Sequence, residues 1–234
     1  PAIRVARLFP DGTVDPGFVP GITFEVPIVG TFRLNDLIVQ PDGRILAAGK
    51  LRTVPQIQGS AGFGIGRMGP NGALDPTFTA AIANGYEARA LCLQSDGKVI
   101  AATTYNSGPS TSTLKRYNTD GSVDATFASG STQAGKIDRT AVLPDGKVMV
   151  VGNFGGYAGT FRDKILRLNT DGTVDTTFNY VTGFSGGIVT HILAQPDGRC
   201  ILSGAFTAYD GNPANGLCRL NTDGSFDTSF APSV

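Results

Sequence analysis

The feature that most constrains this chain is an internal repeat, in which two short sequence boxes alternate along its 234 residues. The first, called here the R-L-N box, reads R-L-N-x-D-G-x-x-D-x-x-F and occupies Arg7–Phe18, Arg67–Phe78, Arg116–Phe127, Arg167–Phe178 and Arg219–Phe230. The second, the Q-P-D-G box, reads Q-P-D-G-K-I-L and occupies Gln40–Leu46, Gln94–Ile100, Leu143–Met149 and Gln195–Ile201. The first recurs at spacings of 60, 49, 51 and 52 residues, and the second at 54, 49 and 52. A period of about fifty residues indicates roughly four and a half copies of one supersecondary unit.

Both boxes are typical of β-hairpins. Pro-Asp-Gly and Thr-Asp-Gly place turn-forming residues in the order that a hairpin needs, because Pro presets φ, Asp bonds its own backbone and Gly adopts a positive φ. The flanks of the first Q-P-D-G turn are β-rich and apolar, with Leu37–Val39 before it and Ile45–Ala47 after it. Apolar runs without strict alternation predict strands that are covered on both faces.

Each unit therefore offers four antiparallel strands, two from each box, and blades stacked face to face would cover both faces of every sheet. This predicts an all-β fold, a β-propeller built from four-stranded antiparallel blades of about fifty residues, with a β-solenoid as the alternative. A single repeat domain is expected over residues 1–234, with a half-unit at 1–18 followed by repeats at 35–78, 87–127, 137–178 and 188–230.

Both ends of the chain carry the same half-unit, since there are five R-L-N boxes and four Q-P-D-G boxes. Three explanations are open: the half-unit begins an incomplete blade, the chain is cut from a longer array, or the ends of different subunits complete each other. The last amounts to end-to-end self-association. The abrupt start at Pro1 favours a processed protein or an excised piece.

The register of the R-L-N hairpin predicts a cross-strand ion pair. With Thr170-Asp171-Gly172 as a three-residue turn, Arg167 lies opposite Asp175. The same arithmetic gives five structural pairs, namely Arg7 with Asp15, Arg67 with Asp75, Arg116 with Asp124, Arg167 with Asp175, and Arg219 with Asp227. We expect these pairs to be partly buried, and bidentate where the geometry permits. Removing one partner would leave the other charge desolvated.

The charge balance disfavours two classes of partner. Lys plus Arg number 19, as do Asp plus Glu, and the charges are spread along the chain without a basic stripe, so no nucleic-acid partner is expected. No apolar run approaches the roughly 18 residues of a membrane-spanning helix, so direct membrane insertion is not expected either.

The alternation of the two boxes resembles the delta-60 repeat family, a bacterial β-propeller repeat of unknown function. Asn169–Asp175 and Gln195–Gly198 follow the family pattern closely, whereas Phe9-Pro10 and Gly69-Pro70-Asn71 depart from it in the turns of the first two copies. The resemblance covers nearly the whole chain. It implies a propeller module within large secreted or surface-attached bacterial proteins, and it implies no catalytic residues.

Two segments match enzyme motifs without the context that those motifs need. Gly183–Gly187 matches the G-x-S-x-G nucleophile elbow, but a loop joins two predicted strands there, and the nearby His191 occupies a strand position that is apolar in other copies. Gly64–Gly69 matches G-x-G-x-x-G but overlies a strand instead of a strand-to-helix turn. Paired catalytic carboxylates are disfavoured because Glu occurs only at Glu25 and Glu87. We therefore predict no enzyme and no cofactor.

A metal site is not expected either. The N-x-D-G-x-x-D core is similar to the calcium loops of integrin-like propeller repeats, but Arg167 stands where those loops carry their first Asp. Asp171 and Asp223 are therefore interpreted as turn formers. Cys200 replaces apolar residues of the other copies and is interpreted as a core residue, while a disulfide with Cys218 stays open.

These observations favour a non-enzymatic structural or spacer module of a bacterial surface or extracellular assembly. The alternative is a ligand-binding propeller that recognises protein or glycan through rim loops. The loops that differ most between copies are Arg52–Gly62, Asn106–Thr113, Gly155–Lys164 and Thr207–Gly216. The binding candidates within them are Tyr157, Phe161, Arg162, Tyr209 and Asp210.

Overall fold

The computed structural model describes residues 5–23, 34–50, 52–53, 64–80, 82, 86–105 and 111–232. These residues form short β-strands joined by turns and bends, which confirms the predicted all-β class. None of them belongs to a helix long and apolar enough to cross a membrane. The chain divides into two compact units, one of Pro1–Ser107 with Tyr117–Asp124 and one of Gly108–Arg116 with Ala125–Val234.

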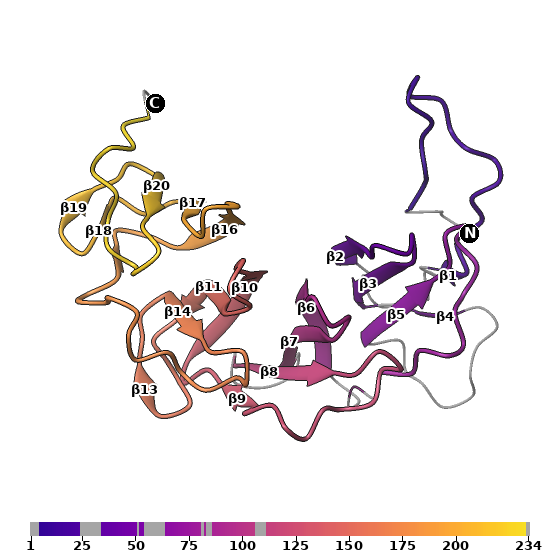
Figure 1. The fold of residues 1–234 in the computed structure, drawn as a ribbon, viewed down its shortest axis with the longest axis horizontal. Coiled ribbons are helices and arrows are strands. Elements are labelled where there is room, and N and C mark those ends of the chain that lie inside the picture. Colours follow the sequence, from indigo (N-terminus) through magenta and orange to yellow (C-terminus); the bar gives the residue numbers. More distant parts are fainter. Residues whose placement is uncertain are drawn as a thin grey trace. The chain divides into compact units, whose positions relative to one another are not determined.

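The first unit is built on two Q-P-D-G hairpins. In the first hairpin β2 (Leu34–Val39) is antiparallel to β3 (Ile45–Gly49), and β5 (Gly64–Met68) extends the sheet in the order β2-β3-β5 (Figure 1). The second hairpin pairs β6 (Tyr86–Leu93) with β7 (Val99–Tyr105). A small sheet pairs β1 (Ile22–Thr23) with β4 (Arg52–Thr53).

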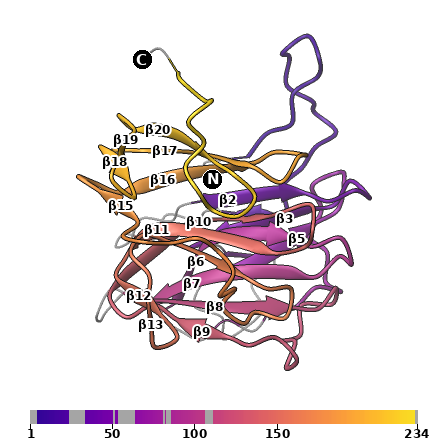
Figure 2. The ribbon, with the colours of Figure 1, turned by 60° about the vertical axis from the view of Figure 1, so that its left-hand side comes forward.

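The second unit repeats the three-stranded arrangement twice. One sheet has the order β10-β11-β14, from strands Gly135–Val142, Val148–Phe154 and Ile165–Leu168 (Figure 1). The next has the order β16-β17-β20, from Val189–Ala194, Cys200–Gly204 and Leu217–Leu220 (Figure 2). Two-residue strands make the remaining ribbons, which are β12 (Gly156–Tyr157) with β13 (Thr160–Phe161), and β15 (Phe184–Ser185) with β18 (Ala208–Tyr209) and β19 (Asn212–Pro213). β8 (Ser112–Tyr117) pairs through Thr113 and Leu114 with β9 (Gly130–Ser131).

The fourth strand predicted for each blade is reduced to a single bridged residue. The bridges join Leu8 to Val14, Met68 to Leu74, Tyr117 to Val123, Leu168 to Val174 and Leu220 to Phe226. The chain then leaves the sheet because the next residue is an Asp whose carboxylate accepts the N–H two positions later, as Asp175 does from Thr177 at 2.9 Å. The antiparallel blade is therefore present, with its outer strand cut short by a local turn.

The first strand of each Q-P-D-G hairpin, namely β2, β6, β10 and β16, contains a β-bulge at the same position. The register shifts between Leu34 and Asp36, Ala88 and Ala90, Ile137 and Arg139, and Val189 and His191. In the first unit the bulges connect neighbouring strands, because Asp36 accepts the N–H of Leu91 at 2.8 Å and Asn35 donates to the carbonyl of Ala88 at 2.8 Å and to Glu87. A bulge re-aims side chains at a strand end, so polar residues can occupy these positions.

The core of each unit lies between successive sheets. In the second unit Met149 and Val151 of β11 belong to the same buried cluster as Leu202 of β17, and in the first unit Leu46 of β3 belongs to one cluster with Leu91 of β6. Every residue of β3 is buried, which agrees with the prediction of strands covered on both faces.

The N-terminal half-unit is less covered than its equivalents. Leu8 is 57% exposed, whereas Met68 and Leu168, which hold the same position in later copies, are 0% exposed. Met68 and Leu168 are buried because their strands pair with β3 and β11. Leu8 precedes the first Q-P-D-G box, and no strand of the described residues pairs with it beyond the bridge to Val14.

The three cysteines are buried, and Cys200 and Cys218 are free thiols. Cys218 pairs in register with Leu202, whereas Cys200 pairs with Leu220, so the two lie on adjacent strands but two residues out of register. Burial raises the pKa of both thiols to about 12. Cys200 thus occupies the core position expected for it, and the disulfide left open by the sequence is not formed.

Candidate functional site

The residues of the apparent enzyme motifs lie apart in the structure. Ser185 ends β15, whereas His191 lies on β16 of a different sheet, is exposed and sits 3.0 Å from the hydroxyl of Thr190 through Nδ1. Gly64 belongs to β5, and a Cβ on it would come within 3.3 Å of the Ile82 side chain. These residues therefore belong to strands and close packing contacts.

The turn of each R-L-N box is shaped by its Asp or Asn. Asp171 Oδ1 accepts the N–H of Thr173 at 3.0 Å and its hydroxyl at 2.7 Å, and these bonds lower the pKa of Asp171. The same N–H bond forms at Asp11, Asn71, Asp120 and Asp223. Among the residues that the structure describes, no group of three His, Cys, Asp or Glu side chains is placed to hold a metal ion.

Four hairpins bring the predicted Arg and Asp together. The distances from Arg Nε to Asp Oδ2 are 2.7 Å for Arg7 with Asp15, 2.8 Å for Arg67 with Asp75, 2.6 Å for Arg167 with Asp175, and 2.7 Å for Arg219 with Asp227. The fifth predicted pair, Arg116 with Asp124, is divided between the two units and stays a prediction. In these four pairs the arginine contacts Oδ2, and Arg7 does so through both Nε and Nη2, at 2.7 and 2.6 Å. The other oxygen, Oδ1, accepts the N–H two residues later, at Gly17, Thr77, Thr177 and Ser229.

A second cation approaches the carboxylate of Asp75, Asp124, Asp175 and Asp227, and this contact was missed in the sequence analysis. Lys147 Nζ lies 2.9 Å from Asp175 Oδ2, and Lys98 Nζ lies 2.8 Å from Asp124 Oδ2. Arginines fill the same position elsewhere, at 3.6 Å for Arg44 with Asp75 and 3.2 Å for Arg199 with Asp227. The signal was available, because Lys or Arg follows the Asp-Gly of all four Q-P-D-G boxes. Each Asp thus couples the two hairpins of its own repeat.

The guanidinium of each R-L-N box also stacks on the Phe that ends the box. The distances from Arg Cζ to the ring centroid are 5.3 Å for Phe18, 4.8 Å for Phe78, 4.9 Å for Phe127, 4.8 Å for Phe178 and 4.8 Å for Phe230. A cation over an aromatic face at this distance is attractive, and more strongly so when it is desolvated. Arg7, Arg67, Arg167 and Arg219 are therefore each fixed by both their own Asp and their own Phe.

The same arginines connect one repeat to the next. In the first unit Arg7 Nη1 donates to the carbonyl of Pro70 at 2.6 Å, and Arg67 Nη1 donates to that of Thr119 at 2.7 Å. In the second unit Arg116 Nη1 donates to the carbonyl of Thr170 at 2.7 Å, and Arg167 Nη1 to that of Thr222. All four acceptors hold the same position in the turn of the following R-L-N box.

A backbone bond accompanies each arginine bond. The residue after the Phe donates its N–H to the next carbonyl of the same turn, from Val19 to Asn71 at 2.9 Å, Thr79 to Asp120 at 2.9 Å, Ala128 to Asp171 at 2.7 Å, and Asn179 to Asp223 at 2.7 Å. We call this pair of bonds, together with the Arg–Phe stack, the repeat joint. It uses a charge-assisted hydrogen bond, which is partly buried at Arg67, Arg116 and Arg167 and exposed at Arg7. Such bonds are among the stronger polar contacts in proteins.

The repeat joint leaves no room for a side chain on the turn glycine. A Cβ on Gly72 would lie 2.7 Å from the carbonyl oxygen of Val19, whereas a Cβ on Gly12 would meet nothing within 4 Å. Both glycines have a positive φ, +88° and +84°, so the backbone strain of a substitution is the same. Gly12→Ala should therefore cost about 1–2 kcal/mol, and Gly72→Ala about 3–5 kcal/mol because it adds a steric clash. Equal losses in urea unfolding would contradict the close approach at the joint.

Acidic pH should lower the stability of the C-terminal hairpin, Arg219–Phe230. The hydroxyl of Ser229, Arg219 and the N–H of Ser229 all favour the Asp227 carboxylate and lower its pKa from 3.8 to about 2. Because the folded pKa is depressed, this contribution is present above the ordinary pKa and is lost as the pH falls towards about 2. The melting temperature of the wild type should decrease as the pH is lowered over this interval. Asp227→Asn should make the melting temperature depend less on pH. A variant with an unchanged profile would contradict this assignment.

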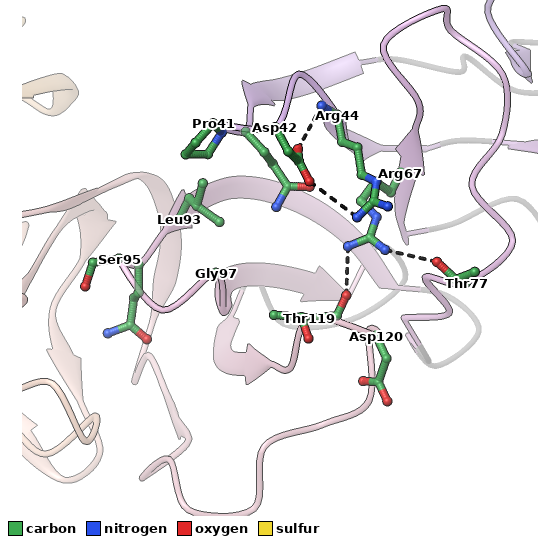
Figure 3. A pocket seen from close by; sticks show the side chains of 12 residues that line it. Pro41, Asp42, Arg44, Arg67, Thr77, Leu93, Ser95, Gly97, Thr119 and Asp120 are labelled. Atoms are coloured by element: carbon green, nitrogen blue, oxygen red, sulfur yellow. Dashed lines mark hydrogen bonds and ion pairs between the residues drawn. The ribbon is translucent and has the colours of Figure 1, made fainter.

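A pocket opens near these joints in the first unit. It has a volume of about 490 Å³ and lies between the turns of the first two Q-P-D-G boxes and Thr119 and Asp120 of the third R-L-N turn (Figure 3). Arg67 is held there by Thr77 and the Thr119 carbonyl, whereas Arg44 is half-exposed and lies 3.3 Å from Asp42. The pocket therefore presents one accessible cation beside carboxylate, amide and hydroxyl groups.

The second unit contains the equivalent opening at about half the volume. It measures about 240 Å³, and Leu143 and Pro196 replace Gln40 and Ser95 of the larger pocket. The side-chain oxygen of Gln40 is buried and has no hydrogen-bond partner within the described residues. The position recurs in the repeat, and the second-unit opening keeps Asp145, Asp197 and Thr222 in its lining.

Two of the five predicted loop candidates are core residues instead. Tyr157 is 1% exposed and Tyr209 is 0% exposed, because Tyr209 packs on Phe184 at 4.8 Å and its hydroxyl donates to the carbonyl of Gly224 at 2.9 Å. Their polar tips made them resemble binding residues in sequence, but an aromatic ring in a short loop is equally suited to cover a core.

The other three candidate residues, Asp210, Arg162 and Phe161, differ in their contacts and exposure. Asp210 accepts the N–H groups of Thr182 and Gly183 at 2.7 Å, and Arg162 stacks on Tyr180 at 4.9 Å. Phe161 is 67% exposed and so remains available to a partner. The predicted loops Arg52–Gly62 and Asn106–Thr113 lie largely outside the described residues.

The segments that form the joints coincide with a known family pattern. A family model described as a domain of unknown function, DUF5122, β-propeller, matches residues 1–18, 40–78, 94–127, 143–178 and 195–230, which is well over half of the chain. The chain belongs to this DUF5122 β-propeller family. Membership confirms the predicted β-propeller repeat, while the narrower delta-60 assignment stays a prediction.

Solved structures resemble the DUF5122 chain in fold. A puromycin hydrolase matches with a TM-score of 0.50 at 14% identity, over 93% of this chain and 33% of the hydrolase chain. A protein of unknown function from Bacteroides caccae matches with a TM-score of 0.39 at 14% identity, over 86% of this chain and 82% of that chain. Identities this low show the fold alone, because propellers support many unrelated functions. A comparison with curated proteins found no match.

Proposed function

We propose that this DUF5122 chain is a non-catalytic structural module of a bacterial surface or extracellular assembly, where rigidly joined repeats act as a spacer. The observation that carries the proposal is the repeat joint, which recurs with the same atoms at Arg7, Arg67, Arg116 and Arg167. The invariant charged side chains of the repeat thus support the fold and the connections between repeats.

The geometry also explains why these charged side chains suit a structural role better than a catalytic one. Asp175 receives Arg167 and Lys147 and also the N–H and hydroxyl of Thr177, so both of its oxygens are occupied. Burial alone would raise the pKa of Asp175, but these hydrogen bonds lower it well below its ordinary range. A carboxylate held in this way is a poor proton acceptor at neutral pH.

A spacer must carry load, so the proposal is tested by pulling the chain from its ends with optical tweezers. We expect each unit to unfold in one cooperative, high-force event, and Arg67→Ala and Arg167→Ala to lower that force. Stepwise unfolding of single repeats at low force would contradict the proposal. So would saturable turnover in a screen of ester, lactone and glycoside substrates that Asp42→Asn or Arg44→Ala abolishes.

A second function, recognition of a small polar ligand such as a glycan residue, is favoured by the pocket of Figure 3. Its volume of about 490 Å³ falls within the range of small-molecule sites, and its lining combines Arg44, Asp42 and the buried amide oxygen of Gln40. Calorimetric titration with a set of neutral and acidic oligosaccharides would detect it. Arg44→Ala should abolish binding, and Arg199→Ala, at the same box position in the last Q-P-D-G box, should leave it intact. A set of sugars that all fail to bind would exclude this function.

A further inference from the structure

The pocket of Figure 3 contains side chains of three hydrogen-bonding kinds. Arg44 supplies N–H donors and is half-exposed, with Nη1 3.3 Å from Asp42 Oδ2. Asp42 and Asp120 supply carboxylate acceptors, and Gln40 supplies an amide, which both donates and accepts. Leu93 adds apolar surface to the same lining. A ligand that fits this pocket must therefore match a donor, two acceptors and an amide.

The second arginine of the pocket, Arg67, is held by groups of the protein itself. Its Nε lies 2.8 Å from Asp75 Oδ2, its Nη1 donates to the Thr119 carbonyl at 2.7 Å, and its Nη2 donates to the Thr77 hydroxyl at 3.2 Å. Its side chain is only 6% exposed. A bound molecule therefore meets the guanidinium of Arg44 and not that of Arg67.

Carboxylates outnumber guanidinium groups around the pocket. Arg44 and Arg67 both contact Asp75, at 3.6 and 2.8 Å, and the two aspartates of the lining add two further carboxylates. Two positive charges therefore lie beside three negative ones. Hydrogen bonds from the hydroxyl and the N–H of Ser122 lower the pKa of Asp120, so this carboxylate is charged at neutral pH. The excess negative charge disfavours an anionic ligand.

Gln40 has a hydrogen bond to gain from a ligand. Its Oε1 is buried and has no hydrogen-bond partner within the described residues. A buried acceptor without a donor is unfavourable, and rotation of the amide towards a hydroxyl group in the pocket would satisfy it. Gln195 Oε1 is in the same state, but Gln195 lines neither of the two pockets described above, so it serves as a matched control.

We infer that the pocket of the first unit binds an uncharged sugar ring and discriminates against the corresponding acidic and amino sugars. A hydroxyl group both donates and accepts, so it matches Arg44, the two carboxylates and the amide of Gln40 alike. A ligand carboxylate only accepts and meets the excess negative charge, whereas a ligand ammonium only donates and leaves the Arg44 donors unpaired. The inference rests on the second function proposed above and names its ligand class.

The experiment compares matched monosaccharides on the full chain at neutral pH, by saturation-transfer NMR titration. Glucose, galactose and mannose are the neutral probes. Their uronates replace the hydroxymethyl group by a carboxylate, and their 2-amino derivatives replace one hydroxyl by an ammonium. At least one neutral sugar should bind, and its uronate and amino derivative should each bind about tenfold more weakly or less.

A change at Asp120 tests the source of the discrimination. Asp120→Asn removes the excess negative charge and keeps the acceptor oxygen of the turn, as Asn71 does at the same position of the second R-L-N box. It should reduce the discrimination against the uronate about threefold or more. Asp171→Asn is the matched control, because Asp171 holds the same turn position but lines neither pocket, and it should leave the discrimination unchanged.

A change at Gln40 tests the contact with the amide. Gln40→Leu introduces the residue that the third Q-P-D-G box carries at this position, Leu143, so the fold accommodates it. It should weaken binding of the neutral sugar about tenfold, because the hydrogen bonds of the amide are lost. Gln195→Leu removes the other buried amide oxygen outside the pocket and should leave sugar binding unchanged.

The possible failures can be told apart. A uronate or amino sugar that binds as tightly as its neutral counterpart would overturn the inference but leave ligand recognition by this pocket standing. Equal effects of Asp120→Asn and Asp171→Asn, or of Gln40→Leu and Gln195→Leu, would do the same. If none of the sugars bound, recognition of a glycan would itself be excluded, and the inference with it. The structural role is tested separately by the pulling experiment.

Discussion

Asp175→Asn is expected to destabilise the second unit by about 3–5 kcal/mol, because it leaves Arg167 and Lys147 facing a neutral group in a buried site. The Asp175 side chain is 3% exposed and that of Arg167 is 5% exposed, so water cannot replace the lost charge. Asp171→Asn is the matched control four residues earlier in the same hairpin. Asp171 is exposed and needs only an acceptor oxygen, which Asn keeps, so its cost should stay below about 1 kcal/mol.

The two variants are compared by urea unfolding at neutral pH, with the slope of the transition monitored to confirm that the same cooperative unit unfolds. Similar losses for both would mean that the carboxylate of Asp175 serves only as a turn former. The coupling of its two cations would then have to be discarded.

Arg167→Ala is expected to cost about 3–5 kcal/mol, whereas Arg219→Ala should cost about 1–2 kcal/mol. Both arginines pair with an Asp and stack on a Phe, and each Asp keeps a second cation, Lys147 or Arg199. The difference is that Arg167 also bonds the Thr222 carbonyl of the next repeat. Comparing the two variants therefore isolates the contribution of the repeat joint and its burial within one unit.

Equal losses in the same unfolding assay would contradict this account, because they would show that the contact with the next repeat adds nothing. A larger loss for Arg219→Ala would contradict it more strongly. The two substitutions remove the same atoms, so side-chain entropy and the unfolded state affect both alike.

Much of the fold could be predicted because its determinants are local. The Asp-Gly turns fix the hairpins. Because Arg167 and Asp175 are eight positions apart, the two residues lie opposite each other, as the bridge between Leu168 and Val174 shows. The truncated outer strand could not be predicted, because it depends on which oxygen of Asp175 faces Arg167 and which one caps the following turn. A full-length outer strand and a truncated one fit the same sequence.

The candidate site was predictable only in part, since its contacts span whole repeats. Nothing in a single box indicates that Arg67 reaches the carbonyl of Thr119, 52 residues later. The second cation at Lys147 was readable from the recurring Lys or Arg after Asp-Gly. Tyr157 and Tyr209 were assigned to binding loops because their burial arises from packing between segments, which sequence variability does not reveal.

Amide hydrogen exchange in dilute protein tests the repeat joint most directly. Asn179 and Ala231 both follow the Phe of an R-L-N box and both are exposed, but among the described residues only the Asn179 N–H is bonded to another turn, through the Asp223 carbonyl at 2.7 Å. The account predicts that the Asn179 amide exchanges with a protection close to that of the core strands, while the Ala231 amide exchanges at once. Equally rapid exchange at both amides would contradict the claim that consecutive repeats are held together by these joints.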